Sequence, residues 1–178
     1  MLERVFFVET GKAKSEAIDY LLAMKHDARS VTMQYLKGIT QDELDWQPYP
    51  GWNTVGALLA HIIAIEKYFS IIFIEARELN KQEEEEILPG ADLLIEKLKG
   101  KPLEYYLEQL EQGNKNANEL ITRIGAAEFT DRKFPHYNKA TGSDLAWILY
   151  HAVEDEVHHR GQISIIRKLY KEMKGKQQ

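Results

Sequence analysis

Apolar residues recur with the spacing of an α-helix along four long stretches of this chain, which constrains its fold more than any other feature. No stretch shows the sustained alternation that is typical of a β-strand. A chain of 178 residues is long enough for one well-packed domain and too short for two comfortable ones. We therefore predict an all-α protein, a four-helix bundle that occupies residues 1–178 as a single domain. The predicted helices cover approximately residues 12–37, 54–78, 102–124 and 143–174.

Residues with short polar side chains mark where two of these helices begin. Asn53 or Thr54 is the predicted N-cap of the second helix, because either side chain can accept a hydrogen bond from the first turn. Thr141 or Ser143 is the predicted N-cap of the fourth helix for the same reason. The loop before the fourth helix contains Phe134, Pro135, His136 and Tyr137.

The connector between the second and third helices is longer than twenty residues. It is long enough to cross the bundle, which would make those two helices parallel rather than antiparallel neighbours. Its block of like charges at Glu83–Glu86 indicates a solvated turn or a frayed helix end. A short helix is expected at residues 92–98, and Pro102 is well placed to begin the third long helix.

The composition excludes several classes of partner. The net charge of −5 argues against a nucleic-acid partner, because phosphate binding favours a large basic face. The chain has no cysteine, so it has neither disulfides nor a thiol nucleophile of its own. The apolar patch at Val5–Val8 is too short for a signal peptide. His61, Glu66 and Lys67 interrupt the apolar stretch 55–74, which disfavours a membrane span. We expect a cytoplasmic protein without a membrane or nucleic-acid partner.

Three polar residues, Asp155, His159 and Gln162, occupy successive core positions of the fourth predicted helix. An ionised carboxylate there needs a compensating positive charge, because burying it alone is costly. Asp155 and His159 are four residues apart, so both side chains can converge on one ion. His61 lies in the very apolar run LLAHIIAI of the second helix and can face the same point. The pattern predicts one divalent metal ion held by His61, Asp155 and His159.

Two histidines and one carboxylate leave coordination positions free for water or substrate, which is typical of a catalytic site. Zinc, nickel and ferrous iron all fit this ligand set. Other interpretations stay open. His61 alone could be a hydrogen-bonded core histidine, and Asp155 with His159 could be a buried pair joined by a charge-assisted hydrogen bond. The neighbouring Glu156 and Arg160 are interpreted as a surface ion pair.

Other polar residues near the predicted ligands are candidates for supporting roles. His151 and His158 flank the polar positions of the fourth helix, where each is an alternative ligand, a supporting group or a surface residue. Gln162 is placed to hydrogen-bond a metal ligand and fix its orientation, or to contact a carbonyl group. Glu66 either faces the site as a general base or ends the most buried part of the second helix.

The segment HAVEDEVHHRGQI at residues 151–163 and the pattern WNTVGALLAH that ends at His61 resemble the DinB-like family, which includes the YfiT-type metal-dependent proteins. The resemblance spans nearly the whole chain. It implies a four-helix bundle of up-down-down-up topology, with one histidine on the second helix and two on the fourth as metal ligands. Carried over to this sequence, these positions are His61, Asp155 and His159, with Asp155 in place of the commoner histidine.

The resemblance also implies an activity. Characterised relatives include transferases that use a low-molecular-weight thiol such as bacillithiol, so we expect a small-molecule thiol and an electrophilic substrate as partners. A divalent ion lowers the pKa of a coordinated thiol from about 8.5, which gives a thiolate at neutral pH. Glu66 or a metal-bound hydroxide is the candidate base in this scheme. Metal-assisted hydrolysis and a non-catalytic bundle, as a ligand-binding or interaction module, remain alternatives, and a homodimer is expected.

Overall fold

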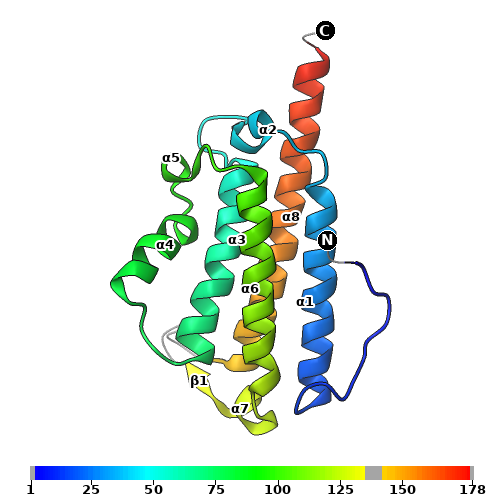
Figure 1. Cartoon of the computed structure of the whole chain (residues 1–178), viewed down its shortest axis with the longest axis vertical. Helices are drawn as coiled ribbons and strands as arrows, with labels where there is room; N and C mark the ends of the chain where they lie inside the picture. Colours follow the sequence, from blue (N-terminus) through cyan, green and yellow to red (C-terminus); the bar gives the residue numbers. More distant parts are fainter. Residues whose placement is uncertain (1–2, 135–141, 177–178) are drawn as a thin grey trace.

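The computed structural model describes residues 3–134 and 142–176, so Pro135, His136, Tyr137 and the candidate cap Thr141 lie outside the described residues. The described chain is mostly helical, which confirms the predicted all-α class. Figure 1 shows its longest helices side by side along the long axis of the molecule, and they correspond to the four predicted stretches. These helices are α1 (Glu16–Tyr35), α3 (Val55–Phe69), α6 (Leu103–Arg123) and α8 (Leu145–Gly175).

Short elements join these helices. α2 (Gln41–Asp45) lies between α1 and α3, and α7 (Ala126–Asp131) follows α6. An antiparallel pair of two-residue strands, β1 (Lys133–Phe134) and β2 (Ser143–Asp144), precedes α8.

The N-caps of α3 and α8 test the two sequence predictions. Thr54 caps α3 by accepting a hydrogen bond from the Ala57 amide, as predicted. The prediction of Ser143 as the cap of α8 is wrong by one residue, because Ser143 pairs with Phe134 in the strand ladder and the helix begins later. The Asp144 carboxylate caps α8 instead, accepting a hydrogen bond from the Trp147 amide at 2.8 Å.

The second long helix ends earlier than its apolar pattern predicts. The α-helical hydrogen bonds stop at Phe69, and a π-helical turn, η1 (Ser70–Ile74), completes the element. Ala76 then takes a φ of 58°, in the left-handed region that disfavours a further helical turn. The whole segment Val55–Ile74 is long and apolar enough to cross a membrane, but half of it is buried inside the protein. Packing of α4, α6 and α8 around α3 accounts for its hydropathy, which is consistent with a soluble protein.

The acidic block in the long connector is part of a regular helix, α4 (Lys81–Ala91), and not a turn or a frayed end. Asn80 and Glu83 form a reciprocal capping box, and acidic side chains in the first turn also interact favourably with the positive end of the helix dipole. The charge block is solvated, as predicted, but the opposite face buries Ile87 and Gly90 against α3. α5 (Ile95–Leu98) follows within the predicted range.

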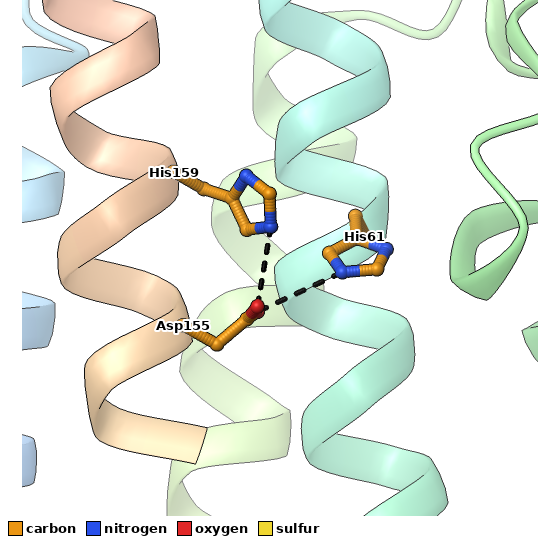
Figure 2. Close-up of side chains that lie close together, drawn as sticks. All are labelled: His61, Asp155 and His159. Atoms are coloured by element: carbon orange, nitrogen blue, oxygen red, sulfur yellow. Dashed lines mark ion pairs between the residues drawn. The ribbon is translucent and has the colours of Figure 1, made fainter. Parts of the chain in front are cut away.

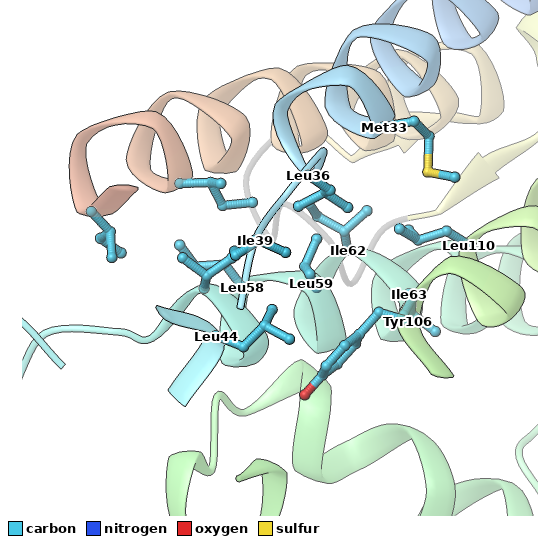
Figure 3. Packing of buried hydrophobic residues seen from close by; sticks show 13 residues of the cluster. Met33, Leu36, Ile39, Leu44, Leu58, Leu59, Ile62, Ile63, Tyr106 and Leu110 are labelled. Atoms are coloured by element: carbon cyan, nitrogen blue, oxygen red, sulfur yellow. The ribbon is translucent and has the colours of Figure 1, made fainter. Parts of the chain in front are cut away.

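Among the described residues, the core consists of two apolar clusters at opposite ends of the long helices. The first contains Leu58 and Leu59 of α3 together with residues from α1, α6 and α8 (Figure 3). The second contains Phe69 of α3 and Phe73 of η1, again with residues from the other three long helices. Along α3, Glu66 separates the two clusters. The stretches that separate them on the other helices contain the buried polar residues Lys25, Arg29, Asn114, Glu156 and His159.

Candidate metal centre

His61, Asp155 and His159 come together where α3 and α8 pass each other (Figure 2). Asp155 Oδ2 lies 3.7 Å from His61 Nε2, and Asp155 Oδ1 lies 3.2 Å from His159 Nε2. The two imidazole rings meet edge to face, with centroids 4.7 Å apart. One potential ligand atom from each residue lies within 4.8 Å of the other two. The predicted convergence of these three side chains is therefore present.

The imidazole of His61 is held from the side that faces away from Asp155. Its Nδ1 lies 3.2 Å from the Gly90 carbonyl oxygen and 3.1 Å from the Ala91 carbonyl oxygen, both at the end of α4. A carbonyl oxygen can only accept, so Nδ1 carries the proton and donates it. In the neutral ring Nε2 then has a free lone pair directed at the candidate metal centre.

Gln162 holds His159 in a similar way. The Gln162 side-chain oxygen lies 3.0 Å from His159 Nδ1, and its amide nitrogen lies 3.0 Å from His158 Nε2. With the amide oriented in this way, His159 Nδ1 donates its proton to the Gln162 oxygen, and its Nε2 faces Asp155. The predicted contact between Gln162 and a candidate ligand is present.

The three groups influence one another's protonation. Burial alone would raise the pKa of Asp155, but the hydrogen bond and charge of His159 outweigh burial and lower it below its ordinary value. Burial lowers the pKa of His61, and the repulsion by His159 adds to this effect although Asp155 opposes it. The pKa of His159 is raised, because hydrogen bonds to Asp155 and Gln162 outweigh the effect of burial. The site therefore combines an ionised carboxylate with one neutral imidazole and one that readily carries a proton.

The donor set fits a divalent cation. Ligand atoms about 2.0–2.2 Å from a tetrahedral ion lie roughly 3.3–3.6 Å from one another. The nitrogen–oxygen distances of 3.7 and 3.2 Å, which run to different oxygens of Asp155, are close to this range, and one ligand atom from each of the three residues lies within 4.8 Å of the others. Imidazole nitrogen and carboxylate oxygen suit zinc, nickel and ferrous iron. Three protein ligands leave further coordination positions for water or substrate.

The other two histidines of α8 are outside this group of three ligands. His158 is exposed and contacts Gln162, so it supports the site only indirectly. His151 stacks on Trp147 at a centroid distance of 4.9 Å and pairs with Glu154 at 2.9 Å. Both fit the supporting or flanking roles considered from the sequence better than a role as a ligand.

The predicted general base Glu66 lies in a different set of contacts. Its carboxylate is 2.6 Å from Lys25 Nζ and 3.3 Å from Arg29 Nη2, and only 8% of the residue is exposed. Burial would raise the pKa of Glu66, but the two cations outweigh it and lower the pKa. A carboxylate stabilised in this way is a poor proton acceptor, so these contacts favour a structural role. Glu66 and Asp155 nevertheless line the same cavity, whose volume of about 30 Å³ suits a water molecule.

The interpretation of Glu156 and Arg160 as a surface ion pair is wrong. Glu156 is buried and accepts a hydrogen bond from Arg29 Nε at 2.9 Å, while Arg160 donates to the Ala28 carbonyl. The sequence contained a signal for this buried network, because Lys25 and Arg29 continue the helical spacing of the apolar residues at the start of α1.

α6 completes the network with two residues that are poor helix formers. Asn114 accepts a hydrogen bond from Lys25 Nζ at 2.6 Å. A Cβ atom on Gly113 would lie 2.7 Å from Glu66 Oε2, so glycine leaves the space that the carboxylate occupies. These two residues weaken the helix locally but accommodate the buried charges.

Comparison with known protein families agrees with the site geometry. The sequence model of the DinB superfamily matches residues 26–163, which include all three candidate ligands and most of the chain. No match is found among curated proteins. The match covers well over half of the sequence and includes the helices that carry the site. The chain therefore belongs to the DinB superfamily.

Proposed function

We propose that this protein binds one divalent metal ion through His61, Asp155 and His159 and transfers a low-molecular-weight thiol to an electrophilic substrate. The convergence of three ligand atoms within 4.8 Å, in a chain of the DinB superfamily, is the observation that carries this proposal. We also propose that α1, α3, α6 and α8 form the up-down-down-up bundle expected from the family resemblance. Zinc, nickel and ferrous iron are the candidate ions.

The residues of the chain define what a bound ion could do here. The ion would supply Lewis acidity that lowers the pKa of a thiol. Because the chain has no cysteine, the thiol must come from a small molecule. The thiol loses its proton to solvent near the partly exposed Asp155, its sulfur forms a bond to the electrophilic carbon, and the leaving group departs with its electron pair. His61 and His159 keep Nδ1 engaged, so each presents Nε2 to the site.

Elemental analysis of protein purified without a histidine tag tests the metal site. We expect about one equivalent of divalent metal per chain, and a loss of most of it in His159→Ala. The matched control is His26→Ala, because His26 on α1 bonds the Glu3 carbonyl and lies outside the group of three ligands. Unchanged metal content in His159→Ala would contradict the ligand assignment.

An assay of the metal-loaded protein with a small thiol and an electrophilic reporter tests the reaction. Thiol-dependent conjugation that disappears in His159→Ala supports a transferase. Turnover of an ester or amide substrate without added thiol would instead support metal-assisted hydrolysis. A loaded protein without either activity would support a binding module.

The cytoplasmic location and the homodimer remain predictions from the sequence. Light scattering on the purified protein measures the mass of the particle and so tests the dimer. A monomer across the accessible concentration range would contradict this part of the proposal.

A further inference from the structure

We propose that Gly90 and Ala91 at the end of α4, together with Gln162 on α8, position the two histidine ligands by fixing which ring nitrogen carries the proton. This inference rests on the proposed metal site and assigns positioning roles to residues beyond the three ligands. Both histidines have Nδ1 within hydrogen-bond distance of an oxygen and Nε2 facing Asp155. Metal-binding histidines generally need such partners, because the partner fixes the ring orientation and raises the basicity of the other nitrogen.

The contact between α4 and His61 depends on an unusually close approach of two helices. A Cβ atom on Gly90 would lie 2.6 Å from the Ala60 carbonyl oxygen and 2.9 Å from the Ala64 Cβ. Both contacts are closer than real side chains tolerate, so any larger residue would push the end of α4 away from α3. Glycine at this position therefore allows the carbonyl groups of Gly90 and Ala91 to reach the His61 ring.

The end of α4 is also fixed by its own backbone. The Leu93 amide donates a hydrogen bond to the Gly90 carbonyl at 3.1 Å, and Leu93 has a φ of 52°. A non-glycine residue in the left-handed region is uncommon and must be held by its surroundings. Leu93 packs against the first apolar cluster, which holds this conformation. The helix therefore ends where its last carbonyl groups face His61. Without His61, the Ala91 carbonyl would be an unsatisfied acceptor at the helix end.

Gln162 provides the corresponding contact for His159 within a single helix. The residue is three positions after His159, so its side chain lies over the same face of α8. Its amide nitrogen contacts His158 Nε2, and this second bond orients the amide with its oxygen toward His159. Gln162 thus connects the exposed His158 to the candidate ligand His159, which gives each of the two adjacent histidines a role at the site.

Two substitutions at Gln162 separate positioning from packing. Gln162→Leu keeps most of the volume and removes the acceptor, so we expect zinc affinity to fall by about 10- to 100-fold in competition with a chromophoric chelator. Gln162→Glu keeps an acceptor for His159 Nδ1 and is expected to retain affinity within about threefold of the unchanged protein. Equal affinity in Gln162→Leu and the unchanged protein, or an equal loss in both variants, would overturn the role of Gln162.

A glycine substitution with a matched control tests the role of α4. Gly90→Ala is expected to weaken zinc binding by about 10- to 100-fold, because α4 can no longer reach His61. Gly161→Ala is the control, since Gly161 lies on α8 with nothing within 4 Å of an added Cβ. Circular dichroism of both metal-free variants checks that they fold. Unchanged zinc affinity in a folded Gly90→Ala variant would overturn the role of α4.

Nitrogen NMR of the metal-free protein tests the same role without any metal. We expect His61 to carry its proton on Nδ1 in the unchanged protein and in Gly161→Ala, and to show a mixture of both neutral forms in Gly90→Ala. A His61 protonated mainly on Nε2 in the unchanged protein would overturn the positioning role. An unchanged protein that binds no zinc but shows the expected His61 form would refute the proposed function and leave the role of α4 in orienting the ring intact.

Discussion

Asp155 is the residue on which the charge balance of the candidate metal centre depends. Its carboxylate lies within 3.2 Å of His159 Nε2 and 3.7 Å of His61 Nε2, and it is only partly exposed. Without an ion, His159 in its protonated form would compensate this negative charge. A divalent cation would take over the same role from the proton. Proton and metal therefore compete for one position.

Metal affinity is expected to rise with pH through the titration of His159. The pKa of His159 is raised above its ordinary value of 6.5, so the imidazole keeps its proton to a higher pH than a solvated histidine. Each ion that binds must displace this proton, which weakens binding at low pH and releases a proton on binding. Zinc titrations between about pH 6 and pH 8.5, in two buffers of different ionisation enthalpy, measure both effects. Affinity that does not change with pH would exclude His159 as a ligand.

Glu66→Gln is expected to lower the free energy of unfolding by about 3–5 kcal/mol, because it removes the carboxylate paired with Lys25 and leaves Arg29 with Glu156 as its one remaining paired carboxylate. Metal content should stay unchanged, since Glu66 is outside the group of three ligands. Urea denaturation measures the stability, with Glu85→Gln on the exposed face of α4 as the control. A full loss of activity with unchanged stability would instead favour the predicted role of Glu66 as a base.

The stabilising effect of Glu66 is expected to depend on pH, and the same variant can be used to measure this dependence. Because the folded-state pKa of Glu66 lies below its ordinary value of 4.5, ionised Glu66 stabilises the fold above that value. The contribution disappears as the pH falls through the lowered pKa. The difference in unfolding free energy between the unchanged protein and Glu66→Gln should therefore shrink below about pH 4.5. A constant difference would contradict the ionised state of Glu66.

At the scale of helices, α6 shows how local weakness can serve tertiary structure. Gly113 and Asn114 reduce the intrinsic helix propensity in the middle of α6. Their positions coincide with the buried ion network of α1, α3 and α8, where one provides space and the other an acceptor. The network connects residues from all four long helices, so a shift of any one of these helices would separate groups that are now paired.

Gly113→Ala is expected to destabilise the protein by about 1–3 kcal/mol, although alanine favours a helix. The added Cβ would approach Glu66 Oε2 to 2.7 Å, and the carboxylate cannot move freely because Lys25 and Arg29 hold it. Gly161→Ala has no such contact and is expected to stabilise α8 by up to about 1 kcal/mol. Thermal denaturation of both variants measures the two opposite effects. Stabilisation by Gly113→Ala would show that the network adapts without cost.

At the scale of the whole molecule, a polar layer divides the core into two apolar clusters. Buried ion pairs generally stabilise a fold less than apolar residues of similar volume would. Binding of an ion at this layer would therefore add stability that the buried ion pairs do not supply. A bound ion would join α3 to α8 across the layer, because His61 lies on one helix and its partners lie on the other.

Addition of zinc is expected to raise the melting temperature of metal-free protein by roughly 5–11 °C at a free concentration of about 100 times Kd, because only the folded state assembles the three ligands. A chelator should reverse the shift. Calorimetry with and without the ion measures this effect, and His61→Ala should abolish most of it. A zinc-induced shift of equal size in His61→Ala would place the ion elsewhere.

The sequence alone determined the four long helices, because helical spacing of apolar residues depends only on which face each residue occupies. It also singled out His61, Asp155, His159 and Gln162 as candidate site residues, since a polar residue within an apolar helix face is costly unless it has a partner. The tertiary structure decided which polar groups meet. The contacts of α4 with His61 and of Glu66 with Lys25 and Arg29 join residues far apart in the chain. Local spacing contains no information on how distant helices are aligned, so only their packing could assign these partners.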